Sequence, residues 1–300
     1  MNLIKGAFPY FIVPLVLSLI LVPVAKKIGL SLNVYAVENS RTVHQGKIVR
    51  MGGLAIFVAY MIALAIFVKA DDTWNGVLIG GSIVFAGGLL DDLYDLKPKY
   101  KLAFQGVGAL VAMLMGNISL GAISLPFGIS IDTGLLSFLV SFVWIVGVTN
   151  AINLIDGLDG LSGGICFIVL CTIGIIGYMM GRRDICVVTL ILSGAILGFL
   201  RYNFHPASIF MGDTGSFVLG TGYAAAVLVC DIPYFGVLAL GVPIISVVIS
   251  LLHRAHIIKL PVEPLHHTLN HYGMSEQKII ITYWLATIAL CVIGILAKMF

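Results

Sequence analysis

Five aspartates lie at the ends of apolar segments that are long enough to cross a bilayer. They form two pairs and one single residue, namely Asp91 with Asp92, Asp156 with Asp159, and Asp213. A carboxylate in or beside a membrane-spanning helix is costly and usually faces a cavity, a cation or a substrate path. Neighbouring carboxylates need a cation to offset their repulsion, and Mg²⁺ prefers oxygen ligands of this kind. The pattern therefore predicts a polar site for a divalent metal, Mg²⁺ with Mn²⁺ as the alternative.

The elements that carry these aspartates belong to a membrane protein. Hydrophobic residues make up 60% of the 300-residue chain, charged residues 10%, and the mean hydropathy is +1.09. These values exclude an ordinary soluble domain and predict an all-α polytopic membrane protein of one domain, 1–300, with about ten transmembrane helices. The apolar runs cover 9–25, 51–69, 77–93, 102–116, 134–151, 162–180, 185–200, 214–230, 232–252 and 279–297. An alternating segment at 117–133 predicts a small β-hairpin outside the membrane.

The distribution of lysine and arginine predicts how the chain is oriented in the membrane. Twelve of the 17 basic residues fall in one set of loops, and five fall in the opposite set. The first set is therefore expected in the cytoplasm of a bacterial-type cell, with the multi-pass chain in the plasma membrane and both termini outside. All seven histidines fall on the cytoplasmic side, so the active site is expected there. A net charge of +3 in ordinary topology-determining loops gives no reason to expect nucleic-acid binding.

Cationic and histidine-rich loops accompany the aspartates on this side. The first inner loop carries His44 and Arg50 just before a helix start, a combination that can hold a phosphate, although the loop by itself is typical of a positive-inside anchor. Lys101 follows the first aspartate pair in a lysine-rich loop. The last loop, 253–273, contains five histidines. Because the other polar groups are carboxylates, which favour Mg²⁺ over a transition metal, we interpret His266 and His267 as phosphate contacts or proton-transfer groups.

The remaining aspartates occur in glycine-containing motifs. Asp156 and Asp159 are three residues apart, so on a helix they would share a face, and the glycines beside them allow a ligand to approach the backbone. Asp213 lies between two glycines at the start of a predicted helix, where it could hold a metal near a phosphate. Phe210 could stack on a base, although packing is the simpler interpretation of that residue alone. Carboxylates, a metal and phosphate-binding cations together suit phosphoryl transfer.

Four long motifs carry a family resemblance. They read RTVHQGKIVRMGG (41–53), DDLYDLKPKYKLAFQ (91–105), TNAINLIDGLDGLSGG (149–164) and GFLRYNFHPASIFMGDTGS (198–216). In these motifs, and over nearly its full length, the chain resembles the polyprenyl-phosphate N-acetylhexosamine-1-phosphate transferases of glycosyltransferase family 4. The resemblance implies a ten-helix membrane enzyme with a cytoplasmic active site. Such enzymes use Mg²⁺ to transfer a sugar-1-phosphate from a UDP-amino sugar to a membrane polyprenyl phosphate, with release of UMP. A homodimer is left open.

The resemblance also implies roles for individual residues. Asp213 would be the first metal ligand and Asp92 the second. Asp91 and Asp92 would be the essential acidic pair, with Asp91 as the candidate base for the lipid phosphate. The uridine and diphosphate of the donor would be held by Asn153, Asp156, Asp159, Asn203 and Phe210. Phosphates and the lipid headgroup would be contacted by Lys101, His266, His267, Arg50 and His44.

Two branches of the family compete for the sugar donor. The four long motifs resemble the branch that transfers GlcNAc-1-phosphate from UDP-GlcNAc to undecaprenyl phosphate, the first membrane step of cell-envelope glycopolymer synthesis. The last loop, EPLHHT at 263–268, is closer to the phospho-MurNAc-pentapeptide transferases of peptidoglycan synthesis, with Thr268 in place of the third histidine. GlcNAc is the favoured donor. A secondary transporter is a more distant alternative, because transporter carboxylates tend to lie near the middle of the bilayer.

Overall fold

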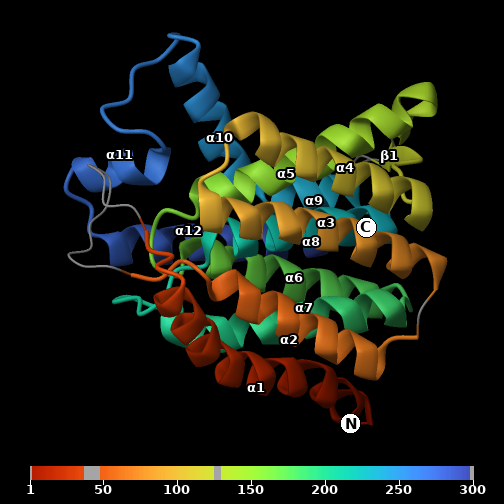
Figure 1. Ribbon diagram of the computed structural model, residues 1–300. Coiled ribbons are helices and arrows are strands. Elements are labelled where there is room, and N and C mark those ends of the chain that lie inside the picture. The colour runs from red at the N-terminus through yellow and green to blue at the C-terminus, as the bar shows by residue number, and fades with distance from the viewer. Residues whose placement is uncertain (1, 37–47, 70, 125–129, 298–300) are drawn as a thin grey trace.

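The fold is a bundle of helices that run largely along one direction (Figure 1). The computed structural model describes residues 2–36, 48–69, 71–124 and 130–297. The elements in chain order are α1 (Asn2–Ser31), α2 (Gly52–Phe67), α3 (Asp72–Tyr94), α4 (Pro98–Gly116), β1 (Ala122–Ser124), β2 (Ser130–Asp132), the 3₁₀ helix η2 (Gly134–Leu136), α5 (Ser137–Ile155), α6 (Leu161–Met179), α7 (Arg183–Asn203), α8 (Gly212–Cys230), α9 (Pro233–Ala239), α10 (Gly241–Arg254), α11 (Leu265–His271) and α12 (Glu276–Leu296).

Long apolar helices establish a polytopic membrane protein. Within the described residues, seven helices are long and apolar enough to cross a membrane, or eight if α9 and α10 together form one bent span. Each of the ten apolar runs coincides with at least one helix of the structure. However, α2 has 16 residues, and α4 is not among the seven helices that meet both the length and the hydropathy requirement. A count of ten spans therefore stays a prediction.

The run 232–252 does not form one straight helix. The structure divides this run into α9 and α10, whose axes differ by 72°. Pro243 lies in the first turn of α10, and a proline lacks the N–H that would continue a preceding helix and clashes with the carbonyl four residues earlier. The last inner loop also contains a short helix, α11, which the sequence pattern did not reveal.

Two short strands occur within the segment 117–133. Strands β1 and β2 pair antiparallel, with Ile123 opposite Ile131. Residues 125–129, which connect them, lie outside the described part of the chain. The strands pack beside η2 and the start of α5, at the opposite end of the bundle from the ends of α3 and α5 that carry the predicted site (Figure 1).

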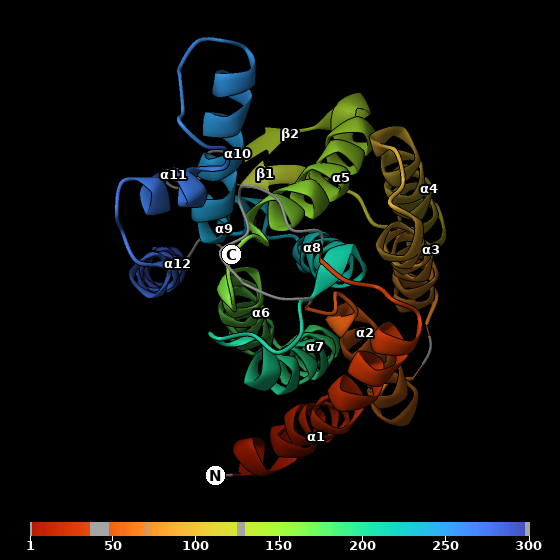
Figure 2. The ribbon, with the colours of Figure 1, turned by 60° about the vertical axis from the view of Figure 1, so that its left-hand side comes forward.

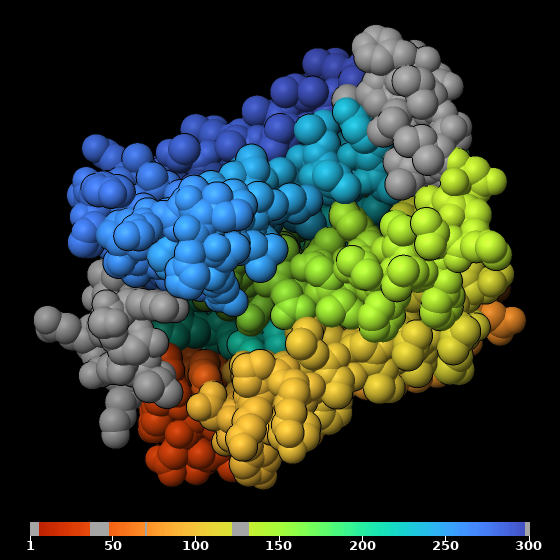
Figure 3. Space-filling model, turned by 90° about the horizontal axis from the view of Figure 1, so that it is seen from above, coloured from red at the N-terminus to blue at the C-terminus, as the bar shows by residue number. Residues whose placement is uncertain are grey.

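Helix α8 occupies the middle of the bundle. It packs against α2, α3, α5, α6 and α7, and the end-on view shows it enclosed by these helices (Figure 2). Helices α3, α5 and α7 end on the same side of the bundle on which α4, α6 and α8 begin (Figure 1). Three of the four motif-bearing segments therefore meet at one end of the molecule. Helix α10 leans away from the body of the bundle toward this same end (Figure 1), and its light-blue residues lie beside the green residues of α5 (Figure 3).

Candidate active site

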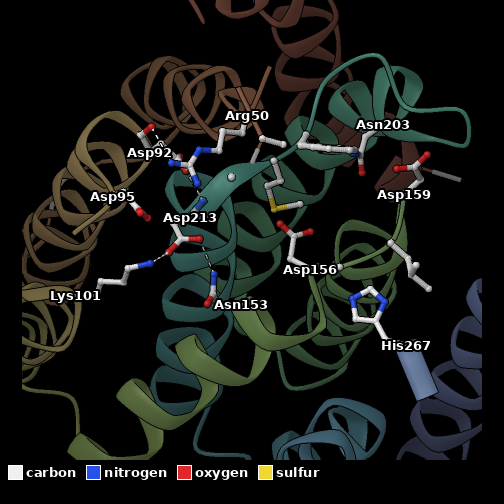
Figure 4. Close-up of a pocket in the computed structure, with 16 residues that line it drawn as sticks. Arg50, Asp92, Asp95, Lys101, Asn153, Asp156, Asp159, Asn203, Asp213 and His267 are labelled. Atoms are coloured by element: carbon white, nitrogen blue, oxygen red, sulfur yellow. Dashed lines mark hydrogen bonds and ion pairs between the residues drawn. The ribbon is translucent and has the colours of Figure 1, made fainter. Parts of the chain in front are cut away.

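A polar cavity of about 650 Å³ opens at the end of the bundle where the motifs meet. Figure 4 shows its side chains converging from α3, α4, α5 and α8 and from the segments between helices. The cavity is lined by Ala36, Arg50, Asp92, Asp95, Lys101, Asn153, Asp156, Gly157, Leu158, Asp159, Asn203, Phe210, Met211, Gly212, Asp213 and His267. Ten of the thirteen predicted site residues are in this set. Asp91 and His266 lie just behind the wall, and His44 lies outside the described residues.

Three carboxylates form a cluster at one side of the cavity. Asp91, Asp92 and Asp213 each offer an oxygen within 4.8 Å of the other two. The side chain of Asp213 is 19% exposed, whereas those of Asp91 and Asp92 are 1% and 0% exposed. Lys101 joins two members of the cluster, because its Nζ lies 2.7 Å from Asp91 Oδ2 and 2.9 Å from Asp213 Oδ2. The cation offsets part of the repulsion that would otherwise drive these carboxylates apart.

The donor set of this cluster fits a hard divalent cation. All three groups are carboxylates, and Mg²⁺ binds through oxygen atoms while keeping several of its waters. Asp213 is the member that faces the open cavity, so it can share an ion with a phosphate ligand. Asn153 lies beside it, where its Nδ2 donates to Asp213 Oδ1 at 2.9 Å and contacts Ser216 Oγ at 3.0 Å. These contacts fix the orientation of the Asp213 carboxylate toward the cavity.

Asp156 follows the last residue of α5 and forms the floor of the cavity. Its Oδ1 accepts a hydrogen bond from the Ser162 hydroxyl in the first turn of α6. Burial raises the pKa of Asp156 to about 7, in spite of the Ser162 hydrogen bond, and the negative charges of Asp213 and Asp92 act in the same direction. A ligand that brings positive charge into the cavity would favour the ionised form of this carboxyl group.

Asp159 and Asn203 hold two segments of the wall together. Asp159 Oδ2 accepts the Ala207 N–H at 2.8 Å and lies 3.3 Å from His205 Nδ1. Asn203 Oδ1 accepts the Gly160 N–H at 2.9 Å, and its Nδ2 donates to the Ile209 carbonyl at 3.0 Å. Both predicted substrate residues therefore use polar atoms to fasten the segment 203–211 to the start of α6.

The two central histidines of the last inner loop pack against Gly157. A Cβ atom at this glycine would lie 2.5 Å from His266 Nε2 and 3.0 Å from His267 Nε2. His267 lines the cavity, whereas His266 is fully buried and neither of its ring nitrogens has a hydrogen-bond partner among the described residues. Burial and the neighbouring His267 lower the pKa of His266 to about 3. His266 is therefore neutral near pH 7.

Replacing Gly157 with alanine is expected to lower turnover about 10²-fold, because the added methyl group must push both imidazoles out of place. Turnover and thermal stability of the purified variant would be measured together. Gly147→Ala is the matched control, because a Cβ atom at Gly147 meets only open space. Gly181 also has open space around it, but its φ of +73° would strain an alanine. Wild-type turnover in Gly157→Ala would contradict the inference that this contact positions the histidine loop.

Arg50 and Phe210 are joined through their backbones. A parallel bridge pairs the two residues, with Phe210 N–H donating to the Val49 carbonyl at 2.8 Å and Gly52 N–H donating to the Phe210 carbonyl at 2.9 Å. This pairing brings the residues just before α2 and the segment before α8 to the same edge of the cavity. The Arg50 side chain extends into the cavity toward Asp92 (Figure 4), and its Nη2 donates to the Asp92 carbonyl at 3.3 Å.

Sequence reasoning missed several residues of the site. Asp95 is exposed at the end of α3, with a left-handed φ of +52°, and also lines the cavity. Thr214 and Ser216 were not singled out, although they contact Asp92 and Asn153. The sequence did contain a signal for Thr214 and Ser216, because both follow Asp213 closely at the start of a predicted helix. Serine and threonine hydroxyls often bind polar groups at a helix start.

Comparison with known proteins identifies the family. Residues 74–231 match the model of glycosyl transferase family 4. A probable undecaprenyl-phosphate N-acetylglucosaminyl 1-phosphate transferase of Bacillus subtilis is 34% identical over 304 aligned positions, which cover 96% of this chain and 84% of that protein. A phospho-N-acetylmuramoyl-pentapeptide-transferase of Clostridium botulinum is 30% identical over 96% of this chain and 94% of its own length.

A third relative matches more strongly over a shorter stretch. A putative phospho-N-acetylmuramoyl-pentapeptide-transferase of Methanothermobacter thermautotrophicus is 62% identical over 106 residues, which are 35% of this chain and 30% of that protein. The chain belongs to glycosyl transferase family 4. It is a multi-pass membrane transferase of a family whose members act on a polyprenyl phosphate lipid and a nucleotide sugar, and this assignment favours the enzyme over the transporter.

Proposed function

We propose that this protein transfers an N-acetylhexosamine-1-phosphate from a UDP-linked donor to a polyprenyl phosphate and releases UMP. The observation that carries the proposal is the convergence of carboxylates, Lys101, Arg50 and His267 on one cavity, from motifs spread between 50 and 267. Anionic groups for a metal and cationic groups for phosphates are the parts that phosphoryl transfer requires, because its catalysis is mostly positioning and charge neutralisation. Family membership supports the same reaction class.

The cofactor in this proposal is Mg²⁺, with Mn²⁺ as a substitute. Asp213 would hold the ion from the cavity side, and the buried Asp91 and Asp92 would add negative charge behind it. When bound, the ion would neutralise the charge of the donor diphosphate and polarise the phosphorus that is attacked. Carboxylate oxygens are the appropriate ligands for either cation.

The residues of the cavity would divide the work of binding and transfer. An oxygen of the lipid phosphate attacks the sugar-bearing phosphorus of the donor, and the bond from that phosphorus to the UMP oxygen breaks. Lys101, Arg50 and His267 would bind the phosphates and hold the reacting atoms in line. The lipid phosphate is largely ionised near neutral pH, because its second pKa is about 6. Asp91 is 1% exposed and paired with Lys101, which supports a part in placing that lysine more than a part as a base.

The nucleotide would bind at the floor and far wall of the cavity. Asp156 and Asn153 have polar groups that face it, and Phe210 lines it and offers a ring on which uracil could stack. Asp159 and Asn203 would shape this part of the site rather than contact the donor, because they hold the wall segments together. His266 would support His267 from behind.

The membrane arrangement in this proposal follows from the distribution of charge. The end of the bundle with the cavity would face the cytoplasm, where UDP-sugars are found, and both termini would lie on the other side. The twelve basic residues of the loops predicted to be cytoplasmic, against five in the opposite set of loops, support the orientation. A site at the inner interface would meet both a soluble donor and an acceptor lipid that stays in the bilayer.

GlcNAc is the donor sugar that we propose, because the four long motifs resemble the GlcNAc branch. MurNAc-pentapeptide is the second candidate, favoured by the last inner loop. His266 and His267 of this loop pack on the aspartate-containing motif at Gly157, and Thr268 donates its hydroxyl hydrogen bond to the Val262 carbonyl. Thr268 therefore acts in the loop's own structure, where the second branch has a third histidine.

UMP release by the purified enzyme tests the proposal. With Mg²⁺ and undecaprenyl phosphate, turnover is expected with UDP-GlcNAc and at least about 10²-fold less with UDP-MurNAc-pentapeptide. A site discriminates strongly against a donor that leaves the polar groups of the site unpaired. Turnover of the pentapeptide donor alone would mean that the last loop, and not the four long motifs, reports the sugar. Reaction with neither donor, nor with other UDP-amino sugars, would contradict the proposed function.

A further inference from the structure

The first turn of α8 has no capping side chain of its own. The residue before the helix is Met211, whose side chain makes no capping hydrogen bond. The first N–H groups of a helix have no partner within the helix, and Ser, Thr, Asp or Asn usually precedes it and accepts a hydrogen bond from the second or third of them. A buried helix start in the middle of the bundle therefore needs an acceptor from another element.

Asp92 of α3 supplies that acceptor. Its Oδ1 accepts the Asp213 N–H at 3.0 Å, and its Oδ2 accepts the Thr214 N–H at 2.9 Å and also the Thr214 hydroxyl. Asp213 and Thr214 are the second and third residues of α8, the positions whose N–H groups an ordinary capping side chain would receive. The negative charge also lies at the positive end of the helix dipole.

Close backbone packing keeps the two helices at the distance that this cap requires. Gly88 lies one turn before Asp92 on α3, and a Cβ atom at Gly88 would be 2.6 Å from the Asp213 carbonyl oxygen. Residues four apart share a helix face, so the glycine and the carboxylate face α8 together. A Cβ atom at Gly212, where φ is +74°, would be 2.5 Å from Asp92 Oδ2. A side chain at Gly88 would therefore collide with the backbone of α8, and one at Gly212 would collide with the Asp92 carboxylate.

We infer that Asp92 is a positioning residue, which fixes Asp213 through the first turn of α8, rather than a direct metal ligand. The inference rests on the proposed function. Both oxygens of Asp92 are directed at α8 and its side chain is 0% exposed, whereas Asp213 is 19% exposed on the cavity side. The adjacent aspartates of the motif thus have different tasks: Asp91 pairs with Lys101 on α4, and Asp92 caps α8.

A double-mutant cycle between Asp92 and Thr214 tests the inference, with Mn²⁺ affinity of the full-length protein as the readout. Mn²⁺ titration followed by electron paramagnetic resonance needs neither donor nor lipid. Asp92→Asn is expected to weaken Mn²⁺ binding about 10- to 100-fold while leaving a measurable site, as removal of an outer-sphere partner does. Asp213→Asn is expected to abolish binding. The double variant Asp92→Asn with Thr214→Val should lose at least about threefold less affinity than the product of the single losses, because both changes break one contact.

Thr221→Val is the matched control for the loss of a buried hydroxyl from α8. Thr221 lies two turns further along the helix and its hydroxyl is paired with that of Thr149 at 2.9 Å. Its effect on the melting temperature should add independently to that of Asp92→Asn, and Mn²⁺ affinity should not change. If Asp92→Asn fails to fold, Thr214→Val alone decides, since an unchanged Mn²⁺ affinity in that variant would overturn the inference.

Two other results would also overturn it. Loss of Mn²⁺ binding in Asp92→Asn as complete as in Asp213→Asn would identify Asp92 as a ligand, and independent effects of Asp92→Asn and Thr214→Val would exclude action through the cap. Failure of the proposed function is distinguishable from these results. A wild-type protein that binds no Mn²⁺ would contradict the proposed cofactor and the inference together, whereas a metal-binding protein that releases no UMP would contradict the proposed reaction alone.

Discussion

Replacing Asp213 with asparagine is expected to lower turnover at least about 10³-fold while leaving the bundle folded. The loss is large because a catalytic metal ion contributes several kcal/mol to the stabilisation of charge in the transition state, and each 1.36 kcal/mol is about tenfold in rate. The amide can still accept the hydrogen bond that Asn153 donates at 2.9 Å. Turnover of UDP-sugar and the melting temperature in detergent would be measured on the same preparation.

Asp231→Asn provides the matched control for this change. Asp231 follows the last residue of the same helix, at the opposite end of α8, and is exposed with a φ of +54°. Asparagine adopts this left-handed conformation readily, so wild-type turnover and stability are expected. Retained activity in Asp213→Asn would contradict the metal assignment, and a collapse of the melting temperature would mean that the carboxylate is needed for folding rather than for chemistry.

Sequence patterns predicted the elements of this protein better than their ends. Apolar runs of bilayer length identify helices because a spanning segment must satisfy its backbone internally. The bend before α10 was missed even though Gly241 and Pro243 signal it, because an apolar run of spanning length gives no indication of where its axis turns. Helix α11 was missed because seven residues between polar loops have too little periodicity for recognition.

Membership of the site was more predictable than the contacts within it. A costly carboxylate at the end of an apolar run indicates a functional position from composition alone. In contrast, the contact between Lys101 and Asp213 joins residues 112 positions apart on α4 and α8, so it depends on how these helices are placed in the bundle. The tasks of Asp159 and Asn203 could not be read from the chain, because most of their partners are backbone groups, those of Ala207, Gly160 and Ile209, and any residue type can supply such groups.

Replacing Lys101 with methionine is expected to separate metal binding from turnover. The lysine Nζ lies within 3 Å of carboxylate oxygens of both Asp91 and Asp213, at 2.7 and 2.9 Å, so it competes with a divalent cation for the same negative charge. Without it, Mn²⁺ affinity should rise about tenfold, since a nearby positive charge is removed from a poorly solvated site. Turnover should fall about 10²-fold, because a preorganised cation for the transferring phosphoryl group is lost.

Lys99→Met is the matched control, two residues earlier on α4. Lys99 is exposed and lies over the Tyr100 ring, with its Nζ 5.0 Å from the ring centroid, and it does not line the cavity. Its loss should leave both metal affinity and turnover near the wild-type values. A fall in Mn²⁺ affinity in Lys101→Met would mean that the lysine organises the carboxylates for the ion instead of competing with it. Unchanged turnover would contradict a phosphate contact, because a cation that only neutralises Asp91 and Asp213 becomes dispensable once the metal has taken its place.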